Sequence, residues 1–131
     1  MVKFGYTINY VRDVDIALSF FEKAFEMKRR FITGEIDYGE LDTGETVLAF
    51  ASHELGLSNF SGGYISSTDS EKPLGIEIAL ITDDVSGIHQ RAIQYGAVEL
   101  KSPETKPWGQ VVSYVRCPSG ILIELCTPVQ S

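Results

Sequence analysis

Two carboxylates stand out in this chain because each interrupts a segment that is otherwise apolar. Glu124 is the charged residue of segment 121–126, and Glu77 lies within the apolar segment 74–82. Burying a lone carboxylate in an apolar strand is costly. Glu124 therefore either faces water on a half-exposed strand or points into a ligand cleft. Two carboxylates on one face could act as general acid and base, bind a metal or attract a cation.

A β-hairpin is predicted to position Glu124. Residues 110–116 are rich in β-branched and aromatic side chains, as strands are. The turn at 118–120 reads Pro-Ser-Gly, in which proline presets φ and glycine accepts a positive φ. The returning strand would place Glu124 beside Tyr114.

The same hairpin sets the distance between the two cysteines. Cys117 should pair with Ile121, and Cys126 should lie opposite Val112. The sulfurs would then be roughly 16 Å apart at the usual rise per residue, which is too far for a disulfide. Two free thiols suit a reducing compartment.

The stretch that begins at Pro107, Pro-Trp-Gly-Gln, then a strand, a Pro-x-Gly turn and a strand ending in Ile-Glu-Leu, resembles the vicinal oxygen chelate superfamily. That superfamily includes glyoxalase I, extradiol dioxygenases, fosfomycin-resistance enzymes and bleomycin-binding resistance proteins. Its turn usually has an acidic residue on each side of the proline, where this chain has Cys117 and Ser119. In its metalloenzymes the final glutamate is a metal ligand, and the matching residue here is Glu124.

The pattern of strands and helices occurs twice. The expected strands cover residues 4–11, 28–33, 37–41 and 45–51, and then 74–82, 98–101, 110–116 and 121–126. The expected helices are 14–25, capped by Asp13, and 85–95, capped by Asp84 and ended by Gly96. Aligning VRDV with TDDV puts Tyr6 on Glu77, and aligning DTGETVLAF with PSGILIELC puts Leu48 on Glu124. This internal repeat predicts two copies of one supersecondary unit.

The predicted fold is therefore α+β, with two βαβββ modules in tandem within a single domain of residues 1–131. Module one covers about 1–52 and module two about 74–131. The linking loop, about 53–73, is rich in Ser and Gly and is expected to be a mobile lid. The resemblance implies that the modules form one concave, partly closed mixed sheet with helices on its outer face.

Strand alternation collects the candidate ligand-binding side chains on one face. The aromatic members resemble the lining of a small-molecule pocket, to which the two carboxylates add polar groups. Trp108 is expected at the rim, with Phe60 and Tyr64 contributed by the loop. On the face itself we expect Tyr6, Tyr10, Tyr38, Phe50, Glu77, Tyr114 and Glu124.

The resemblance also allows a test for a metal. Carried over residue by residue, the four ligand positions fall on Tyr6, Leu48 (or its neighbour Ala49), Glu77 and Glu124. Leucine and alanine cannot bind a metal, tyrosine is a poor ligand, and two carboxylates fall short of the usual three. The expectation is therefore no metal and no cofactor. Of the two histidines, His89 is expected to be solvated, and His53 is either a surface residue or close enough to reach the cleft mouth.

Two functions remain open. The first is a metal-free protein that binds a small aromatic or cationic molecule, similar to the antibiotic-sequestering resistance proteins. The alternative is a divergent metal-dependent lyase or dioxygenase whose site is completed by His53, water or substrate. Whether the chain is an enzyme is left undecided.

Composition limits the partners. The formal net charge of −7 argues against nucleic acid and anionic membranes. No apolar run reaches the length of a membrane span, and the N-terminus lacks a signal-peptide pattern, so a cytoplasmic location is expected. The resemblance implies a homodimer.

Overall fold

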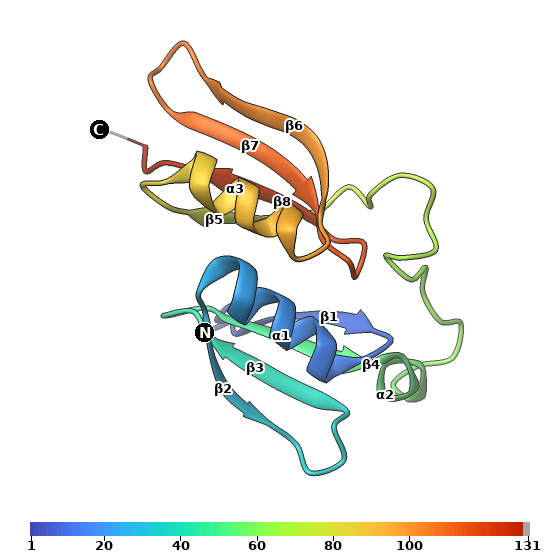
Figure 1. The fold of residues 1–131 in the computed structure, drawn as a ribbon. Coiled ribbons are helices and arrows are strands. Elements are labelled where there is room, and N and C mark those ends of the chain that lie inside the picture. Colours follow the sequence, from blue (N-terminus) through green and yellow to red (C-terminus); the bar gives the residue numbers. More distant parts are fainter. Residues whose placement is uncertain (130–131) are drawn as a thin grey trace. The chain divides into compact units, whose positions relative to one another are not determined.

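The computed structural model describes residues 1–129. The chain divides into two compact units, which we call unit 1 (residues 1–66) and unit 2 (from residue 67 onward). Each unit contains one four-stranded mixed sheet built from a strand, a helix and three further strands (Figure 1). The predicted α+β fold with two βαβββ modules in tandem is confirmed. No helix in residues 1–129 is long and apolar enough to cross a membrane.

Unit 1 contains β1 (Tyr6–Val11), α1 (Val14–Phe25), β2 (Lys28–Ile32), β3 (Tyr38–Asp42) and β4 (Val47–Ser52). The strand order is β1-β4-β3-β2, with β1 parallel to β4 and the other pairs antiparallel. Helix α1 covers one face of this sheet (Figure 1).

Helix α1 begins where the sequence predicts, because the Asp13 side chain accepts the backbone N–H of Ile16 at 2.9 Å. Its apolar stripe is buried, and Phe21 packs against Phe50 of β4 with ring centroids 5.1 Å apart. Phe50 is fully buried on this helix side of the sheet. The structure therefore places it in the core of unit 1, away from the face on which the ligand-binding set was expected.

Unit 2 contains β5 (Glu77–Ile81), α3 (Val85–Gln94), β6 (Val98–Thr105), β7 (Val111–Arg116) and β8 (Leu122–Cys126). The order β5-β8-β7-β6 repeats that of unit 1, again with the first and last strands parallel. Strand β6 is longer than expected, because Glu104 and Thr105 still pair with β7 beyond two irregularities in register. Part of the loop expected at 102–109 is thus strand.

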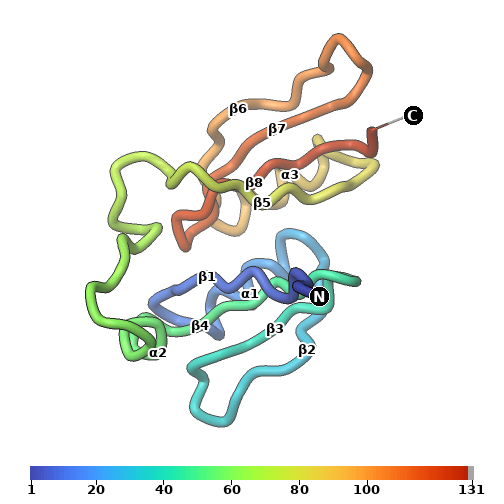
Figure 2. The backbone as a smooth tube through the Cα atoms, turned by 180° about the vertical axis from the view of Figure 1, so that it is seen from behind, coloured from blue at the N-terminus to red at the C-terminus, as the bar shows by residue number. Residues whose placement is uncertain are grey.

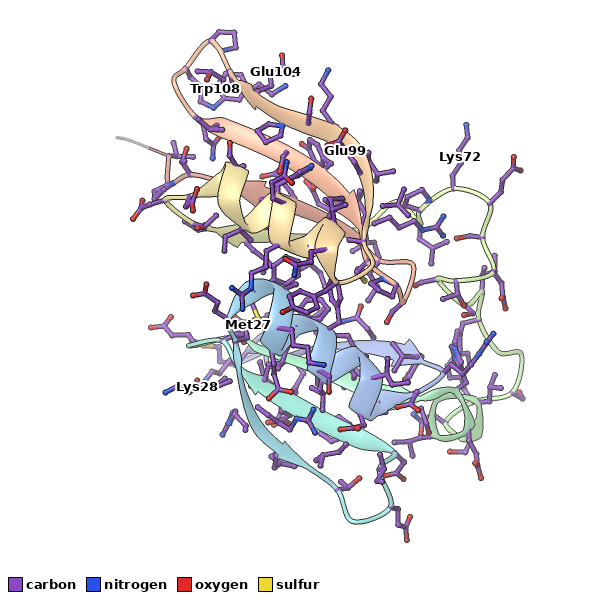
Figure 3. The ribbon with its side chains drawn as sticks, viewed as in Figure 1. Met27, Lys28, Lys72, Glu99, Glu104 and Trp108 are labelled. Atoms are coloured by element: carbon purple, nitrogen blue, oxygen red, sulfur yellow. The ribbon has the colours of Figure 1, made fainter. Side chains whose placement is uncertain are left out.

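Helix α3 carries a buried histidine where a solvated one was expected. His89 is 2% exposed. Its Nδ1 lies 2.9 Å from Ser113 Oγ of β7, and its Nε2 lies 2.7 Å from Glu99 Oε2 of β6. Figure 3 labels Glu99. The imidazole therefore joins the helix to two strands, and the prediction of a solvated His89 is wrong.

The segment that connects β4 to β5 has more regular structure than the predicted loop. Helix α2 (His53–Ser58) follows β4 directly, because the Ser52 side chain accepts the N–H of Leu55 at 3.1 Å. The chain then runs without regular structure to β5 (Figure 2). Its first part belongs to unit 1, and residues 67–71 belong to unit 2.

Arg116 of β7 holds residues 67–71, which we call the strap, onto unit 2. Its guanidinium donates to the carbonyl oxygens of Ser67 at 2.7 Å, Ser70 at 3.0 Å and Glu71 at 3.3 Å. A Cβ added at Gly120, in the β7–β8 turn, would collide with the Ser67 carbonyl oxygen. Close backbone contact and four hydrogen bonds from the guanidinium, counting one to Ser70 Oγ, fix the strap, and a bond to Gly120 O orients the guanidinium.

Candidate functional site

The sheet of unit 2 brings a tyrosine and a carboxylate together on the face opposite α3. Tyr114 of β7 and Glu124 of β8 are register partners, and Ala79 of β5 lies on the other side of Glu124. The Tyr114 hydroxyl donates to Glu124 Oε1 at 2.9 Å. The pKa of Tyr114 is raised to about 12, mainly by this hydrogen bond and further by burial and the charges of the nearby carboxylates. The predicted pairing of Tyr114 with Glu124 is confirmed.

Glu77 joins this pair from the edge strand β5. It lies two residues before Ala79 and therefore on the same face. Burial, the charge of Glu124 and a hydrogen bond to the Glu124 carboxyl raise the pKa of Glu77. The register places Glu77 diagonal to Glu124 on the neighbouring strand, so the two carboxyl groups form one acidic pair. Glu77 is an exposed residue, so this acidic pair of Glu77 and Glu124 is within reach of a ligand.

The Cys126 thiol lies beside the acidic pair on β8. Burial, a hydrogen bond to Glu124 and the charges of Glu124 and Glu77 raise the pKa of Cys126 to about 11. Because only the thiolate is a strong nucleophile, this cysteine stays protonated and unreactive at neutral pH. The group can bind a cation through its carboxylates, but it offers no activated nucleophile.

The residues present do not fit a transition-metal site of the kind that the superfamily resemblance implies. Glu77 and Glu124 are the carboxylates of the group, and residues 1–129 contain no cluster of three or more His, Cys, Asp or Glu side chains suited to hold a metal. The register also decides a point that the sequence left open. Ala49 pairs with Ile8 as Glu124 pairs with Ala79, so Ala49 rather than Leu48 is the counterpart of Glu124. An alanine cannot supply a ligand.

The sheet of unit 1 presents a second polar group on the face opposite α1. Tyr38 and Glu40 lie two residues apart on β3, and the Tyr38 hydroxyl donates to Glu40 Oε2 at 2.7 Å. Burial and then this bond raise the pKa of Tyr38. Sequence reasoning included Tyr38 and missed Glu40, although strand alternation in YGELD places both on one face.

Tyr6 and Tyr10 of β1 lie on this same face, because they pair with Val47 and Ala51 of β4. Tyr6 is 58% exposed, and Phe60 is 52% exposed. Tyr10 packs against Tyr64 with ring centroids 4.7 Å apart, and the Tyr64 hydroxyl contacts His53 Nδ1 at 2.7 Å. Tyr10 and Tyr64 therefore help to fasten the segment after β4, and His53 is engaged there too.

Trp108 lies at the tip of the hairpin formed by β6 and β7 (Figure 3). Its side chain is 65% exposed, and its indole N–H donates to Gln110 Oε1 at 2.9 Å. The Gln110 amide in turn donates to the carbonyl of Thr127 at 2.8 Å. The indole is thus tethered at the tip of the hairpin, just before β7 begins.

Comparison with known proteins identifies similar chains. A family model described as a glyoxalase-like domain matches residues 4–130. No curated protein matches the chain. Many solved structures share the fold, and three of them, all at low sequence identity, are described next.

The first is a glyoxalase-related enzyme from Fulvimarina pelagi, with 17% identity, a TM-score of 0.81 and coverage of 98% of this chain and 89% of that one. A glyoxalase/bleomycin resistance protein/dioxygenase family enzyme from Burkholderia phytofirmans has 20% identity, a TM-score of 0.73 and coverage of 98% and 100%. TioX from a Micromonospora species has 20% identity, a TM-score of 0.66 and coverage of 96% and 98%. At these identities the structures establish the fold alone.

Proposed function

Because the chain belongs to the family of glyoxalase-like domains, we propose that it uses this fold to bind a small cationic, planar molecule at the acidic pair of unit 2. The observation that carries the proposal is that Glu77 and Glu124 lie diagonally on the neighbouring strands β5 and β8, on one face of the sheet, and that Glu77 is exposed. Two adjacent carboxylates repel each other unless they share a proton or meet a cation. A cationic ligand supplies the missing charge.

The Tyr114 hydroxyl supports this role by fixing the Glu124 carboxylate. One oxygen of Glu124 accepts from Tyr114, so the orientation of the carboxylate is set before a ligand arrives. An ammonium or amidinium group would then form charge-assisted hydrogen bonds with the acidic pair. Within unit 2, Tyr114 is the candidate for stacking on a planar body.

Sequestration of a cationic antibiotic is the role that we propose to test first. The family resemblance includes bleomycin-binding proteins, and one solved structure of the same fold carries bleomycin resistance in its family name. Binding without turnover suits a site with a protonated thiol and no activated nucleophile.

Calorimetric titration of the purified, chelator-treated protein against bleomycin-like and other planar cationic compounds tests the proposal. Glu124→Gln should weaken the best ligand about tenfold or more, because it removes a charged hydrogen-bond acceptor. Glu71→Gln, which removes an exposed carboxylate outside the pair, is the matched control. Equal loss in both variants would contradict a specific site.

The same titration distinguishes metal-free binding from the alternative, a metal-dependent lyase or dioxygenase. Ligand binding or turnover is measured again after addition of Zn²⁺, Ni²⁺, Fe²⁺ or Mn²⁺. If it then appears for the first time, and Glu124→Gln abolishes it, the result favours the metal-dependent function over metal-free binding.

We also expect a homodimer in solution. Within the described residues, β5 and β6 each pair along one side only, and they expose Ile81 at 70% and Val98 at 62%. Apolar edge strands are usually covered. Light scattering that gives the mass of a single chain at micromolar concentration would contradict this expectation.

A further inference from the structure

Arg116 lies on the same face of unit 2 as the acidic pair. It pairs with Leu122 of β8, and Leu122 pairs with Glu77 of β5. Register partners direct their side chains to the same side of a sheet, so Arg116 and Glu77 flank Leu122 on the face opposite α3. Glu124 follows Leu122 by two residues and is therefore diagonal to Arg116 on the neighbouring strand. Such diagonal neighbours are roughly 7–8 Å apart, a distance that long side chains can bridge.

The guanidinium of Arg116 nevertheless contacts the strap and not the carboxylates. Its Nη1 donates to the carbonyl of Glu71 at 3.3 Å, and its Nη2 donates to the carbonyl of Ser67 at 2.7 Å. Among residues 1–129, no ion pair involves Glu77 or Glu124. The strap therefore binds a cation that would otherwise be available to the acidic pair.

The strap can open without disrupting the sheet. Residues 67–71 form turns and bends and have no strand ladder of their own. Besides the bonds from Arg116, the Ser70 hydroxyl donates to the carbonyl of Ser67 at 3.1 Å. A segment that is held by side-chain bonds opens at lower cost than paired strands do. When it opens, the guanidinium loses its carbonyl acceptors, and the carboxylates on the same face become its acceptors of opposite charge.

We propose that the strap keeps Arg116 away from the acidic pair, and that release of the strap makes Arg116 an internal cation that binds Glu77 and Glu124 and excludes a cationic ligand. The docked strap thus leaves the acidic pair open, and the released strap closes it. The effect on ligand binding rests on the proposed function, whereas the movement of Arg116 does not. All the groups involved belong to unit 2.

Gly120→Ala releases the strap, because the added Cβ collides with the Ser67 carbonyl. Carboxyl ¹³C NMR of Glu77 then reports the arrival of Arg116 without any ligand. Burial and the charge of Glu124 raise the pKa of Glu77 in the wild type, and a guanidinium beside it would lower that pKa. We expect a lower Glu77 pKa in Gly120→Ala, the wild-type value in Gly75→Ala, where a Cβ meets open space, and recovery in Gly120→Ala/Arg116→Gln.

Benzamidine is the ligand probe, because its planar amidinium can donate two parallel hydrogen bonds to a carboxylate. Gly120→Ala should weaken its binding about two- to fivefold, the usual effect of a competing exposed ion pair. Gly120→Ala/Arg116→Gln should restore the wild-type affinity. Gly120→Ala/Lys72→Gln should stay weak, since Lys72 is an exposed cation outside the strap (Figure 3). Damage to the fold alone would not be repaired by removal of Arg116.

Ser70→Ala gives the same test if Gly120→Ala does not fold. It removes the bond from Ser70 to the Ser67 carbonyl and the bond that Ser70 Oγ accepts from Arg116 at 3.2 Å, and it adds no atom. The Glu77 pKa and the benzamidine affinity should fall less than in Gly120→Ala, and Ser70→Ala/Arg116→Gln should restore both.

Two results would overturn the inference. One is a Glu77 titration that stays at its wild-type position although amide hydrogen exchange at residues 67–71 has become faster. The other is a double variant without Arg116 that binds benzamidine as weakly as the single variant. A wild-type protein that does not bind benzamidine counts against the proposed function instead, and the Glu77 titration then still decides whether Arg116 moves.

Discussion

Tyr114 and Glu124 face each other across β7 and β8, and the tyrosine hydroxyl donates to the carboxylate at 2.9 Å. Unit 1 contains a tyrosine–carboxylate bond as well, but Tyr38 and Glu40 are neighbours along one strand. Both modules therefore contain a tyrosine–carboxylate hydrogen bond, but residues at different positions of the two sheets form it. In each, a neutral hydroxyl orients a carboxylate on the sheet face away from the helix.

The first prediction concerns the titration of Tyr114. Glu124→Gln should lower the pKa of Tyr114 from about 12 toward 10, because the largest cause of the shift is the hydrogen bond to Glu124. NMR of tyrosine labelled with ¹³C at Cζ follows this residue through an alkaline titration. Glu40→Gln is the matched control, which should move Tyr38 and leave Tyr114 in place. An unchanged Tyr114 titration in Glu124→Gln would show that the bond is not formed in solution.

The pairing of the second hairpin was predictable because its turn chemistry fixes the register. Proline and glycine in the turn at 118–120 leave little choice of partners, and Tyr114 meets Glu124 as expected. Gly120 adopts a φ of 84°, which few other residues tolerate.

The register of the first hairpin could not be transferred from the second by the repeat. In the β3–β4 hairpin, Leu41 pairs with Leu48, seven residues later in the chain. In the β7–β8 hairpin, Arg116 pairs with Leu122, six residues later. A difference of one residue reverses which face each side chain takes. For this reason Phe50 faces α1, and Tyr38 pairs with Ala51 rather than with Leu48.

The burial of His89 was predicted wrongly from its residue type, although its spacing along the helix indicates a buried position. It lies four residues after Val85 and three before Ala92, which places it on the buried stripe of α3. A histidine is often exposed, and its partners Ser113 and Glu99 come from distant strands. Such a polar contact is set by tertiary packing, so a single sequence gives little sign of it.

A second prediction follows from the raised pKa of Glu77. A carboxyl whose pKa is higher in the folded state stabilises the fold below its unfolded pKa of about 4.3, and that stabilisation is lost as the pH rises through the folded pKa. Glu77→Gln lacks this loss. The urea midpoint of Glu77→Gln minus that of the wild type should therefore be larger at pH 7 than at pH 4.

Glu71→Gln, outside the acidic pair, serves as the control for this comparison. A Glu77→Gln advantage that is the same at both pH values would mean that Glu77 and Glu124 do not interact in the free protein.

The third prediction concerns the turn between β2 and β3. Ile36 has a φ of 58°, a left-handed conformation that is costly for a β-branched side chain, and it is 54% exposed. Ile36→Gly should stabilise unit 1 by about 0.5–1 kcal/mol, because relief of strain exceeds the entropy cost of glycine. Ile65→Gly, at an exposed position without a positive φ, should not stabilise. Urea unfolding measures both, and a destabilised Ile36→Gly would show that the turn is not strained.

The final prediction tests how the strap is held. Gly120→Ala should destabilise the protein by at least about 2 kcal/mol, because the new Cβ meets the Ser67 carbonyl and the φ of 84° disfavours alanine. Gly75→Ala is the matched control, since it has open space around it and no positive φ.

Arg116→Ala separates loss of the strap from loss of the fold. It removes the donors to Ser67, Ser70 and Glu71 while leaving the β7–β8 backbone pairing intact. Hydrogen exchange should accelerate at residues 67–71 and stay slow in β7 and β8, because the strap depends on side-chain bonds and the strands on their own ladder. Arg116→Lys should restore part of the protection, since one ammonium can reach fewer of the carbonyls than the guanidinium does. If exchange at 67–71 is as fast in the wild type as in Arg116→Ala, the strap is not held by Arg116 in solution.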